Sequence, residues 1–479
     1  LVLDLVVNHT SDEHPWFEEA RKSRHNPYYN YYHWWPAEKG EPPLRLSYFD
    51  EEGNAWMYNK STDSYYLHYF SRKQPDLNWE NPEVRQEIFD MMRFWFDKGI
   101  DGFRMDSISL IAKDPSFPLI DSKKYPDIFS FYAKEPRLHL YLHEMNRQVL
   151  SKYDCMSVGE GSAVMVDDVA KFVDPAREEL NMLYHFDAAR IRNTTLPDNP
   201  ESGIDYSLIA LKKMFTEWDK AVDKGWPSIY LGNHDQPRMV SRFGSDKDEF
   251  RALSAKMLIT FLLTMRGTPY WFAGDEIGMR NIRFDRIEDY NDIDTINRYK
   301  KAKAEGKDPQ AVLDEQKETG RDNARTPFQW DRSPETGFTA GTPWLKVNPD
   351  YTWINVADEE KDPTSILNYF KKVVSFRKEN PSLIYGSYHL LDAENPQSYT
   401  FLRKTGADTY LIMLNFSPKA AISTPGIDMS NAHVLLDNYG DRSHMAPQKD
   451  ITLRPFEAIV FQLNHPVYES FIDSLDLLE

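Results

Sequence analysis

An arginine precedes an aspartate by two positions in Gly-Phe-Arg-Met-Asp, residues 102–106. The apolar residues around this pair are typical of a short strand, and residues i and i+2 of a strand share a face. We therefore expect Arg104 and Asp106 to lie side by side at the carboxyl end of a strand. A permanent cation beside a carboxylate favours the ionised form that a nucleophile needs. Taken alone, the pair fits an ordinary structural ion pair equally well.

Further polar side chains follow other apolar runs. His9 ends the run at 1–7, Glu160 ends Met-Ser-Val-Gly, and His234 and Asp235 follow Ser-Ile-Tyr-Leu-Gly-Asn. Glycines on both sides of Glu160 suggest that its side chain is presented with little steric shielding. Two carboxylates about 5–5.5 Å apart, one acid and one nucleophile, form the arrangement of a retaining glycosidase. Neutral histidines beside them could hydrogen-bond sugar hydroxyls, although each residue taken singly also fits an ordinary strand end.

The elements that would position these groups alternate along the chain. Apolar periodicity predicts helices at 82–98, 138–150, 206–223, 248–266 and 364–378. Strands are predicted at 1–7, 100–106, 156–160, 180–187, 228–235 and 268–276. Such alternation predicts βα units and a parallel sheet, and polar residues at each carboxyl end favour a (β/α)₈ TIM barrel. A doubly wound sheet is the alternative, but no glycine-rich dinucleotide fingerprint follows any strand.

Two segments depart from this alternation. Residues 10–75 are dense in aromatic side chains and too long for a plain loop, which predicts an inserted domain. Residues 381–479 contain short alternating strands at 399–404, 409–416, 433–436 and 451–463, separated by turn signals, which predicts a C-terminal β-sandwich. The predicted barrel domain is then 1–9 with 76–380, and its stretch 280–345 is polar, charged and partly helical.

The composition excludes several classes of protein. The 479 residues carry a net charge of −18, and the acidic surface that this implies argues against nucleic acid or an anionic membrane as a partner. No apolar run approaches the roughly 20 residues that span a bilayer. Cys155 is the only cysteine, so no intrachain disulfide and no cysteine metal site is expected. A 14% share of aromatic residues suits sugar-binding clefts, but it also suits an ordinary core.

Several ordered motifs together resemble the α-amylase superfamily, in its oligo-1,6-glucosidase and α-glucosidase branch. The motifs are Asp-Leu-Val-Val-Asn-His (4–9), Gln-Pro-Asp-Leu-Asn (74–78), Gly-Phe-Arg-Met-Asp (102–106), Val-Gly-Glu-Gly (158–161), Asn-His-Asp-Gln-Pro-Arg (233–238), Gly-Thr-Pro-Tyr-Trp-Phe-Ala-Gly-Asp-Glu-Ile-Gly (267–278) and Gly-Arg-Asp-Asn-Ala-Arg-Thr-Pro-Phe-Gln-Trp-Asp (320–331). The resemblance covers nearly the whole chain.

The resemblance implies a role for each matching residue. Asp106 would be the nucleophile, Glu160 the acid/base, and Asp235 the transition-state stabiliser that binds the 2- and 3-hydroxyls. Arg104 would orient Asp106. His9, His234 and Arg321 would bind the reacting glucose, and Phe49 would form an aromatic wall near the cleft.

The implied activity is retaining, exo-acting hydrolysis of terminal α-1,6 or α-1,4 glucosidic bonds by double displacement. The implied substrates are short oligosaccharides such as isomaltose, isomaltooligosaccharides, maltose or sucrose. No cofactor and no metal are expected, because the family's metal-binding loop would precede residue 1. The linkage preference stays open, because Ser107 is neither the Val associated with α-1,6 preference nor the Thr associated with α-1,4 preference.

The chain departs from the family pattern at its start, because it begins without Met inside a strand. Two family strands would precede it, so we expect a fragment of the barrel with its N-terminal strands missing, an exposed strand edge and poor solubility. A signal peptide is not observable in such a sequence.

Other functions within the same architecture are the alternatives. One is an α-glucosyl transferase or sucrose isomerase, and another is a non-catalytic glucosidase-like protein. The isomerase signature Arg-Leu-Asp-Arg is absent from 187–193, while Arg283-Phe-Asp-Arg286 falls after the last barrel strand. A non-catalytic relative would tend to lose the three carboxylates, which this chain keeps.

Overall fold

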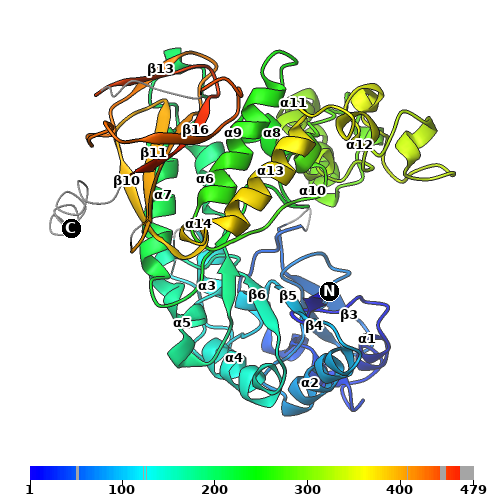
Figure 1. Ribbon diagram of the computed structural model, residues 1–479. Coiled ribbons are helices and arrows are strands. Elements are labelled where there is room, and N and C mark those ends of the chain that lie inside the picture. Colours follow the sequence, from blue (N-terminus) through cyan, green and yellow to red (C-terminus); the bar gives the residue numbers. More distant parts are fainter. Residues whose placement is uncertain (50–52, 122, 126, 407, 443–448, 464–479) are drawn as a thin grey trace. The chain divides into compact units, whose positions relative to one another are not determined.

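The computed structural model describes residues 1–49, 53–121, 123–125, 127–406, 408–442 and 449–463 (Figure 1). The chain forms two compact units, Leu1–Phe186 with Ala221–Pro227, and Asp187–Lys220 with Ser228–Glu479. No helix among the described residues is both long and apolar enough to cross a membrane.

A four-stranded parallel sheet forms the centre of the first unit. It consists of β1 (Val2–Val6), β5 (Gly102–Asp106), β6 (Met156–Glu160) and β7 (Met182–Tyr184), in that spatial order. Phe103 and Met105 are buried, whereas the alternate positions of β5 carry Arg104 and Asp106. Because all four strands are parallel, their carboxyl ends share one edge of the sheet.

Helix α2 (Pro82–Asp97) shows why the sequence places a helix before β5. The Asn81 side chain accepts the Glu83 N–H as an N-cap, and Pro82 occupies the first helical position. Gly99 follows the last turn with φ +91°, a left-handed conformation that suits glycine. One face buries apolar side chains spaced three and four residues apart: Val84, Ile88, Phe89, Met92 and Phe96.

The remaining helices of the first unit are α1 (Pro15–Ala20), α3 (Phe129–Tyr132), α4 (Arg137–Gln148) and α5 (Ala170–Val173). Within 10–75, an antiparallel sheet has the order β2 (Trp34–Pro36), β4 (Ser64–Leu67) and β3 (Trp56–Asn59). Aromatic and apolar side chains form its core, which accounts for the aromatic density of this segment: Ala55, Trp56, Leu67, Tyr69, Leu110, Phe117 and Tyr132.

The second unit continues the βα pattern. Strands β8 (Ser228–Ile229) and β9 (Thr268–Pro269) pair in parallel, and α9 (Arg251–Thr264) precedes β9. The other helices are α6 (Asp187–Thr194), α7 (Leu208–Ala221), α8 (Met239–Phe243), α10 (Ile293–Ala304), α11 (Pro309–Thr319), α12 (Val356–Glu359), α13 (Ile366–Glu379) and α14 (Ser382–Tyr385). Short 3₁₀ turns connect many of these elements.

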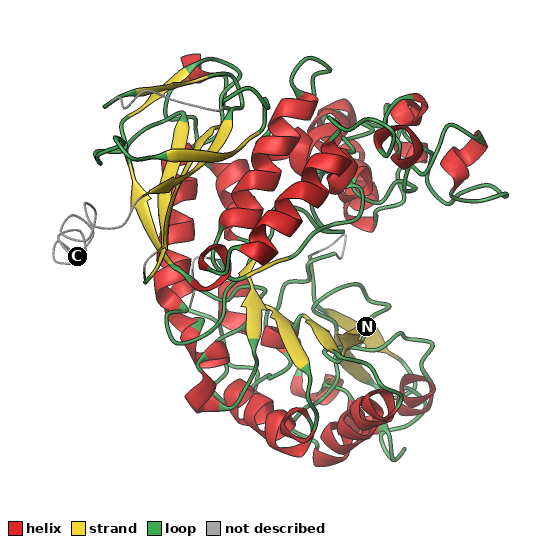
Figure 2. Ribbon diagram, viewed as in Figure 1, coloured by secondary structure: helices red, strands yellow, loops and turns green. Residues whose placement is uncertain are grey.

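Antiparallel sheets follow residue 386 (Figure 2, yellow). The larger sheet has the order β10 (Ser387–Leu391), β11 (Ser398–Thr405), β12 (Asp408–Asn415), β16 (Ala458–Leu463) and β14 (His433–Asp437). A smaller sheet pairs β13 (Ala421–Ser423) with β15 (Ile451–Leu453). Alternate apolar side chains bury a common core, including Leu402, Leu411, Met413 and Phe461.

Some predicted strands are wrong in length. The run at 180–187 is a strand only at 182–184, and Asp187 begins α6 instead. The run at 451–463 is two strands, because Pro455 lacks an N–H and Phe456 has φ +49°. The predicted strands at 228–235 and 268–276 keep only two residues each. In the first of these, the chain leaves the strand after Ile229. Its polar end at 233–235 forms a turn in which the Asn233 side-chain oxygen accepts the Asp235 N–H.

Candidate active site

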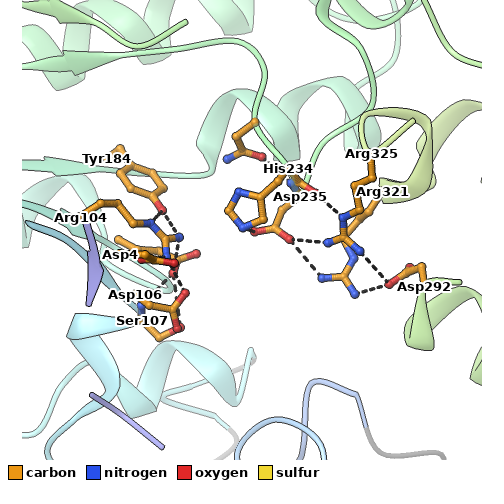
Figure 3. A network of polar contacts seen from close by, with 12 residues as sticks. Asp4, Arg104, Asp106, Ser107, Tyr184, His234, Asp235, Asp292, Arg321 and Arg325 are labelled. Atoms are coloured by element: carbon orange, nitrogen blue, oxygen red, sulfur yellow. Dashed lines mark hydrogen bonds and ion pairs between the residues drawn. The ribbon is translucent and has the colours of Figure 1, made fainter. Parts of the chain in front are cut away.

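Arg104 connects four polar groups at the edge of the parallel sheet (Figure 3). Its Nη1 donates to Asp106 Oδ1 at 2.6 Å and to Asp4 Oδ1 at 2.9 Å. Its Nη2 donates to Glu160 Oε2 at 3.0 Å, and its Nε donates to the Tyr184 hydroxyl at 2.9 Å. The predicted pair of Arg104 and Asp106 is therefore present, and the same guanidinium also binds Glu160.

The strand register explains this convergence. Asp4 lies opposite Arg104 across β1 and β5, and Glu160 lies opposite Tyr184 across β6 and β7. Burial acts to lower the pKa of Arg104, but the charge of Glu160, together with the other neighbours, outweighs burial and holds the pKa above its usual range. The guanidinium is thus a permanent cation between two carboxylates.

Glu160 is held by backbone as well as by Arg104. The Ser107 N–H donates to Glu160 Oε2 at 2.8 Å, and the Ser107 Oγ lies 3.4 Å from the same oxygen. Ser107 has φ +45°, a left-handed conformation that is uncommon for residues other than glycine. The sharp turn after Asp106 therefore points the Ser107 amide at the neighbouring strand end.

The glycines beside Glu160 serve packing, contrary to our expectation of low steric shielding. The Glu160 side chain is only 7% exposed. A Cβ on Gly159 would lie 2.7 Å from Leu180 and 2.8 Å from Ile108, and one on Gly161 would lie 2.5 Å from Leu183. These glycines let β6 approach its neighbours closely, so that Glu160 sits in a buried site.

His9 follows β1 and lies on the same unit as Asp106. Its Nε2 is 3.0 Å from the Gln74 side-chain nitrogen, and burial lowers its pKa despite nearby carboxylates, so the neutral imidazole predominates at neutral pH. The preceding Asn8 accepts from the buried Lys113 ammonium at 2.6 Å, which is also 3.0 Å from Asp76. This buried ion pair fixes the Asn8–His9 segment.

The Phe70 ring lies between Phe49 and His9 and contacts both. The ring centroid of Phe49 is 5.8 Å from that of Phe70, which is itself 5.1 Å from the His9 ring. A cavity of about 680 Å³ also opens beside His9, lined by His14, Trp16 and Gln74 among others. Neither Asp106 nor Glu160 lines this cavity, so it does not contain the carboxylate pair.

The second unit holds a separate cluster around Asp235 (Figure 3). Asp235 Oδ1 accepts from Arg321 Nη1 and from Arg325 Nη2, each at 3.1 Å. His234 Nε2 lies 3.2 Å from Asp235 Oδ2, and the His234 carbonyl accepts from Arg325 Nε at 2.8 Å. The side chain of Asp235 is 23% exposed, so it remains accessible within this ring of donors.

Several residues of the two clusters were missed in the sequence. Tyr184 was missed because it lies three residues before the predicted strand end, and its position opposite Glu160 follows only from the register between β6 and β7. Arg325 was missed although it follows Arg321 by four positions, the spacing that places two side chains on one face of a helical turn. Asp4 begins the motif at 4–9 but was assigned no role, and Asp292 lies in none of the quoted motifs; only tertiary pairing brings these carboxylates to their arginines.

The candidate sites contain no obvious metal centre. In the ranges of the chain that the structure describes, no group of three or more His, Cys, Asp or Glu side chains is arranged to hold a metal ion. The side chains that gather in the two clusters carry carboxylate, guanidinium, imidazole and phenol groups.

Comparison with known proteins gives consistent matches. Residues 1–386 match the model of the α-amylase catalytic domain. The chain is 49% identical to the oligo-1,6-glucosidase of Parageobacillus thermoglucosidasius and 39% identical to the α-glucosidase of Pediococcus pentosaceus, covering 97% of this chain and 83% of each relative. A variant of MutB, a trehalulose synthase from Pseudomonas mesoacidophila MX-45, in complex with the substrate sucrose superimposes with a TM-score of 0.90 at 38% identity, covering 96% of this chain and 83% of MutB.

Proposed function

The chain belongs to the α-amylase family and is a glycoside hydrolase of its oligo-1,6-glucosidase and α-glucosidase branch, and from this premise we propose that Asp106, Glu160 and Asp235 carry its chemistry. Its parallel strands are strands of a (β/α)₈ barrel, followed by a C-terminal antiparallel β-domain. The enzyme is exo-acting on α-glucosidic bonds, and its substrate is a small sugar.

The proposed reaction is a double displacement. Asp106 attacks the anomeric carbon while Glu160 gives a proton to the leaving glycosidic oxygen, so that the glycosidic bond breaks and a glycosyl ester forms on Asp106. Water then gives a proton to Glu160 and attacks the anomeric carbon, so that the bond between this carbon and the Asp106 oxygen breaks, glucose is released and the Asp106 carboxylate is restored. Two inversions at one carbon give net retention of the α configuration.

The observation that carries this proposal is the bridging of both carboxylates by one guanidinium. Asp106 and Glu160 bind the two terminal nitrogens of Arg104 at 2.6 and 3.0 Å, which supports a close and fixed pair. Since Glu160 Oε2 already accepts from Arg104 and from the Ser107 amide, the proton for the leaving group would reside on Oε1. Arg104 would thereby hold Asp106 in place as the nucleophile and leave Oε1 of Glu160 to carry the proton for the leaving group.

We propose that Asp235 binds the 2- and 3-hydroxyls of the reacting glucose. An ionised carboxylate accepts strong hydrogen bonds from hydroxyls, and these bonds strengthen as positive charge develops on the sugar ring. His9 and His234 would add hydrogen-bonding groups to the same sugar, and Phe49 an apolar wall. Arg321, for which the resemblance implies a contact with the glucose itself, and Arg325 both contact Asp235 directly, and we propose that they act through it.

Short α-1,6-linked oligosaccharides such as isomaltose are the substrates we propose first, with maltose as the α-1,4 competitor. The high identity to several oligo-1,6-glucosidases supports this order. Ser107 lies directly after Asp106 and is 3% exposed. Because serine is neither the Val associated with α-1,6 preference nor the Thr associated with α-1,4 preference, the ratio of activities on isomaltose and maltose decides the linkage.

The proposed roles are tested by chemical rescue with azide. Asp106→Gly should lose hydrolysis by several orders of magnitude, and added azide should attack the anomeric carbon directly to give the β-glucosyl azide. In Glu160→Ala, azide should instead intercept the ester on Asp106 and give the α-glucosyl azide. Near-normal turnover in Asp106→Asn would contradict the assignment of the nucleophile.

Sucrose isomerisation is the second candidate, favoured by the likeness to MutB. The arginines of α6 are engaged elsewhere, since Arg192 binds Asp205 and Arg190 lies 3.5 Å from Asp187. Arg283 and Arg286 also pair locally, with Glu318 and Asp289 respectively. We therefore expect glucose and fructose from sucrose, whereas accumulation of an isomeric disaccharide would support the isomerase.

A further inference from the structure

Two arginines of the second unit are shared between two carboxylates (Figure 3). Arg321 binds Asp235 Oδ1 through Nη1 and binds Asp292 Oδ1 through Nη2. Arg325 binds Asp235 Oδ1 at 3.1 Å, and its Nη1 lies 3.7 Å from Asp292 Oδ1. The four groups thus form a closed ring of alternating charge, with Asp235 on one side and Asp292 on the other.

Asp292 differs from Asp235 in burial and in fixation. The Asp292 side chain is 2% exposed, against 23% for Asp235. It caps helix α10, where it contacts the Thr295 amide and hydroxyl, and its own N–H donates to the buried Asp322 carboxylate at 2.8 Å. Burial acts to raise the pKa of Asp292, but the charges of Arg321 and Arg325, together with the hydrogen bonds from Arg321 and Thr295, outweigh burial and hold the pKa below its usual range.

We propose that Asp292 is a positioning residue for Asp235, holding Arg321 and Arg325 in place and taking up part of their positive charge so that Asp235 keeps its negative charge for the sugar. The inference rests on the proposed function, in which Asp235 binds the 2- and 3-hydroxyls.

The physical reason is a competition between two carboxylates for the same donors. An oxygen that already accepts two charge-assisted hydrogen bonds has less electron density to offer a hydroxyl. Neutralising Asp292 leaves more of the cationic charge of both arginines acting on Asp235 Oδ1. The sugar hydroxyls would then have to compete with two guanidinium groups that no longer have a second strong acceptor in Asp292.

The first test compares the same substitution at two helix N-caps of the enzyme, the buried Asp292 and the exposed Asp308. Asp292→Asn removes the charge but keeps a side chain that caps helices as well as aspartate does. Asp308→Asn is the control, because Asp308 caps the neighbouring helix α11 through the Gln310 amide at 2.9 Å and, among the described residues, no hydrogen bond or ion pair joins it to the ring. On p-nitrophenyl α-glucoside we expect kcat/KM to fall about 10- to 100-fold in Asp292→Asn and to change little in Asp308→Asn.

The second test asks whether the loss passes through Asp235. With p-nitrophenyl 2-deoxy-α-glucoside the substrate lacks one hydroxyl that Asp235 would bind, so the loss caused by Asp292→Asn should be several-fold smaller. This ratio of losses does not depend on the folded fraction of the variant. If Asp292→Asn cannot be purified, Asp292→Ser serves instead, since serine also caps helices but carries no charge, and it predicts the same ratio.

A rescue experiment completes the test. In the Asp292→Asn background, Arg325→Gln removes the unmatched cation and should recover part of kcat/KM, which a purely structural role of Asp292 would not predict.

Equal losses on the two substrates, or equal activities of Asp292→Asn and Asp308→Asn, would overturn the proposal. Asp235→Asn separates the two levels: near-normal activity there would overturn the proposed function itself, whereas an inactive Asp235→Asn with an unaffected Asp292→Asn would overturn only this inference.

Discussion

Arg104 is the residue on which the carboxylate pair depends, and Tyr184 fixes its orientation. Tyr184→Phe removes the hydroxyl that accepts from Arg104 Nε at 2.9 Å. A hydrogen bond to a charged group contributes about 1.5 kcal/mol or more, so kcat/KM should fall roughly tenfold. Tyr66→Phe is the control, because Tyr66 is equally buried and its hydroxyl donates to the Arg72 carbonyl. Similar kinetics in both variants would argue against a role for Tyr184.

Ser107 is the residue at which linkage preference can be tested. Its φ of +45° makes any β-branched replacement strained by about 1–2 kcal/mol, so both Ser107→Val and Ser107→Thr should lower the melting temperature. Because the two variants share this strain, the difference between them reports on the methyl against the hydroxyl. We expect a higher isomaltose-to-maltose ratio of kcat/KM in Ser107→Val, by roughly 10-fold or more. An unchanged ratio would place the control elsewhere.

At the residue scale, the sequence motifs predicted which side chains form the site and that they lie at strand ends, but not which side chains they contact. Arg104 and Asp106 are two positions apart on one strand, so their contact follows from local geometry. The contacts of Arg104 with Asp4 and Glu160 depend on the register between separate strands, which a single sequence does not specify. The strained backbone of Ser107 likewise has no sequence signal, because serine is compatible with many conformations.

At the element scale, Glu359 joins helix α12 to α13 and makes stability depend on pH. It is 7% exposed and accepts the Leu367 N–H at 2.9 Å, while Arg251 is 3.8 Å away. Burial raises the pKa of Glu359 to about 7 from its ordinary value of 4.5. Between these values the folded state holds a proton that the unfolded state has released, so stability falls as pH rises through this window and levels off above about 7.

Glu359→Gln should remove this dependence, because the amide oxygen still accepts from Leu367 but does not ionise. Relative to the wild type, the variant should gain at most about 3 kcal/mol of unfolding free energy between pH 4.5 and 7. Urea titrations at the two ends of the window measure this gain. Glu360→Gln, at an exposed neighbour paired with Lys371 at 3.6 Å, should show no such trend. A parallel pH dependence in the wild type and Glu359→Gln would contradict the assignment.

The helices were predicted more accurately than the short strands, for a physical reason. A long amphipathic pattern is local, so α2, α7, α9 and α13 lie within two or three residues of their predicted bounds. Even there, the end of α9 depends on distant groups, since the buried Arg377 donates to the carbonyls of Leu263 and Met265. Strand ends such as 180–187 depend on whether a neighbour continues the ladder, which periodicity does not report.

At the scale of the whole molecule, the fold class and the enzyme family were predicted from ordered motifs and are confirmed by the family match over residues 1–386. The domain boundaries at 9, 75 and 380 stay predictions, and so do the roles of the site residues. The composition argued against classes of partner and did not indicate a function. A net charge of −18 suits a neutral sugar substrate better than a polyanion such as nucleic acid. The chemistry itself follows from carboxylates on separate strands and loops, not from the fold class alone.

The central claim is a double displacement by Asp106 and Glu160, and the anomeric form of the first product tests it most directly. Proton NMR of isomaltose or p-nitrophenyl α-glucoside during the first minutes of hydrolysis distinguishes α-glucose from β-glucose before mutarotation mixes them. Our account predicts that α-glucose appears first, because two inversions restore the starting configuration. Initial release of β-glucose would show a single displacement by water and would contradict the account.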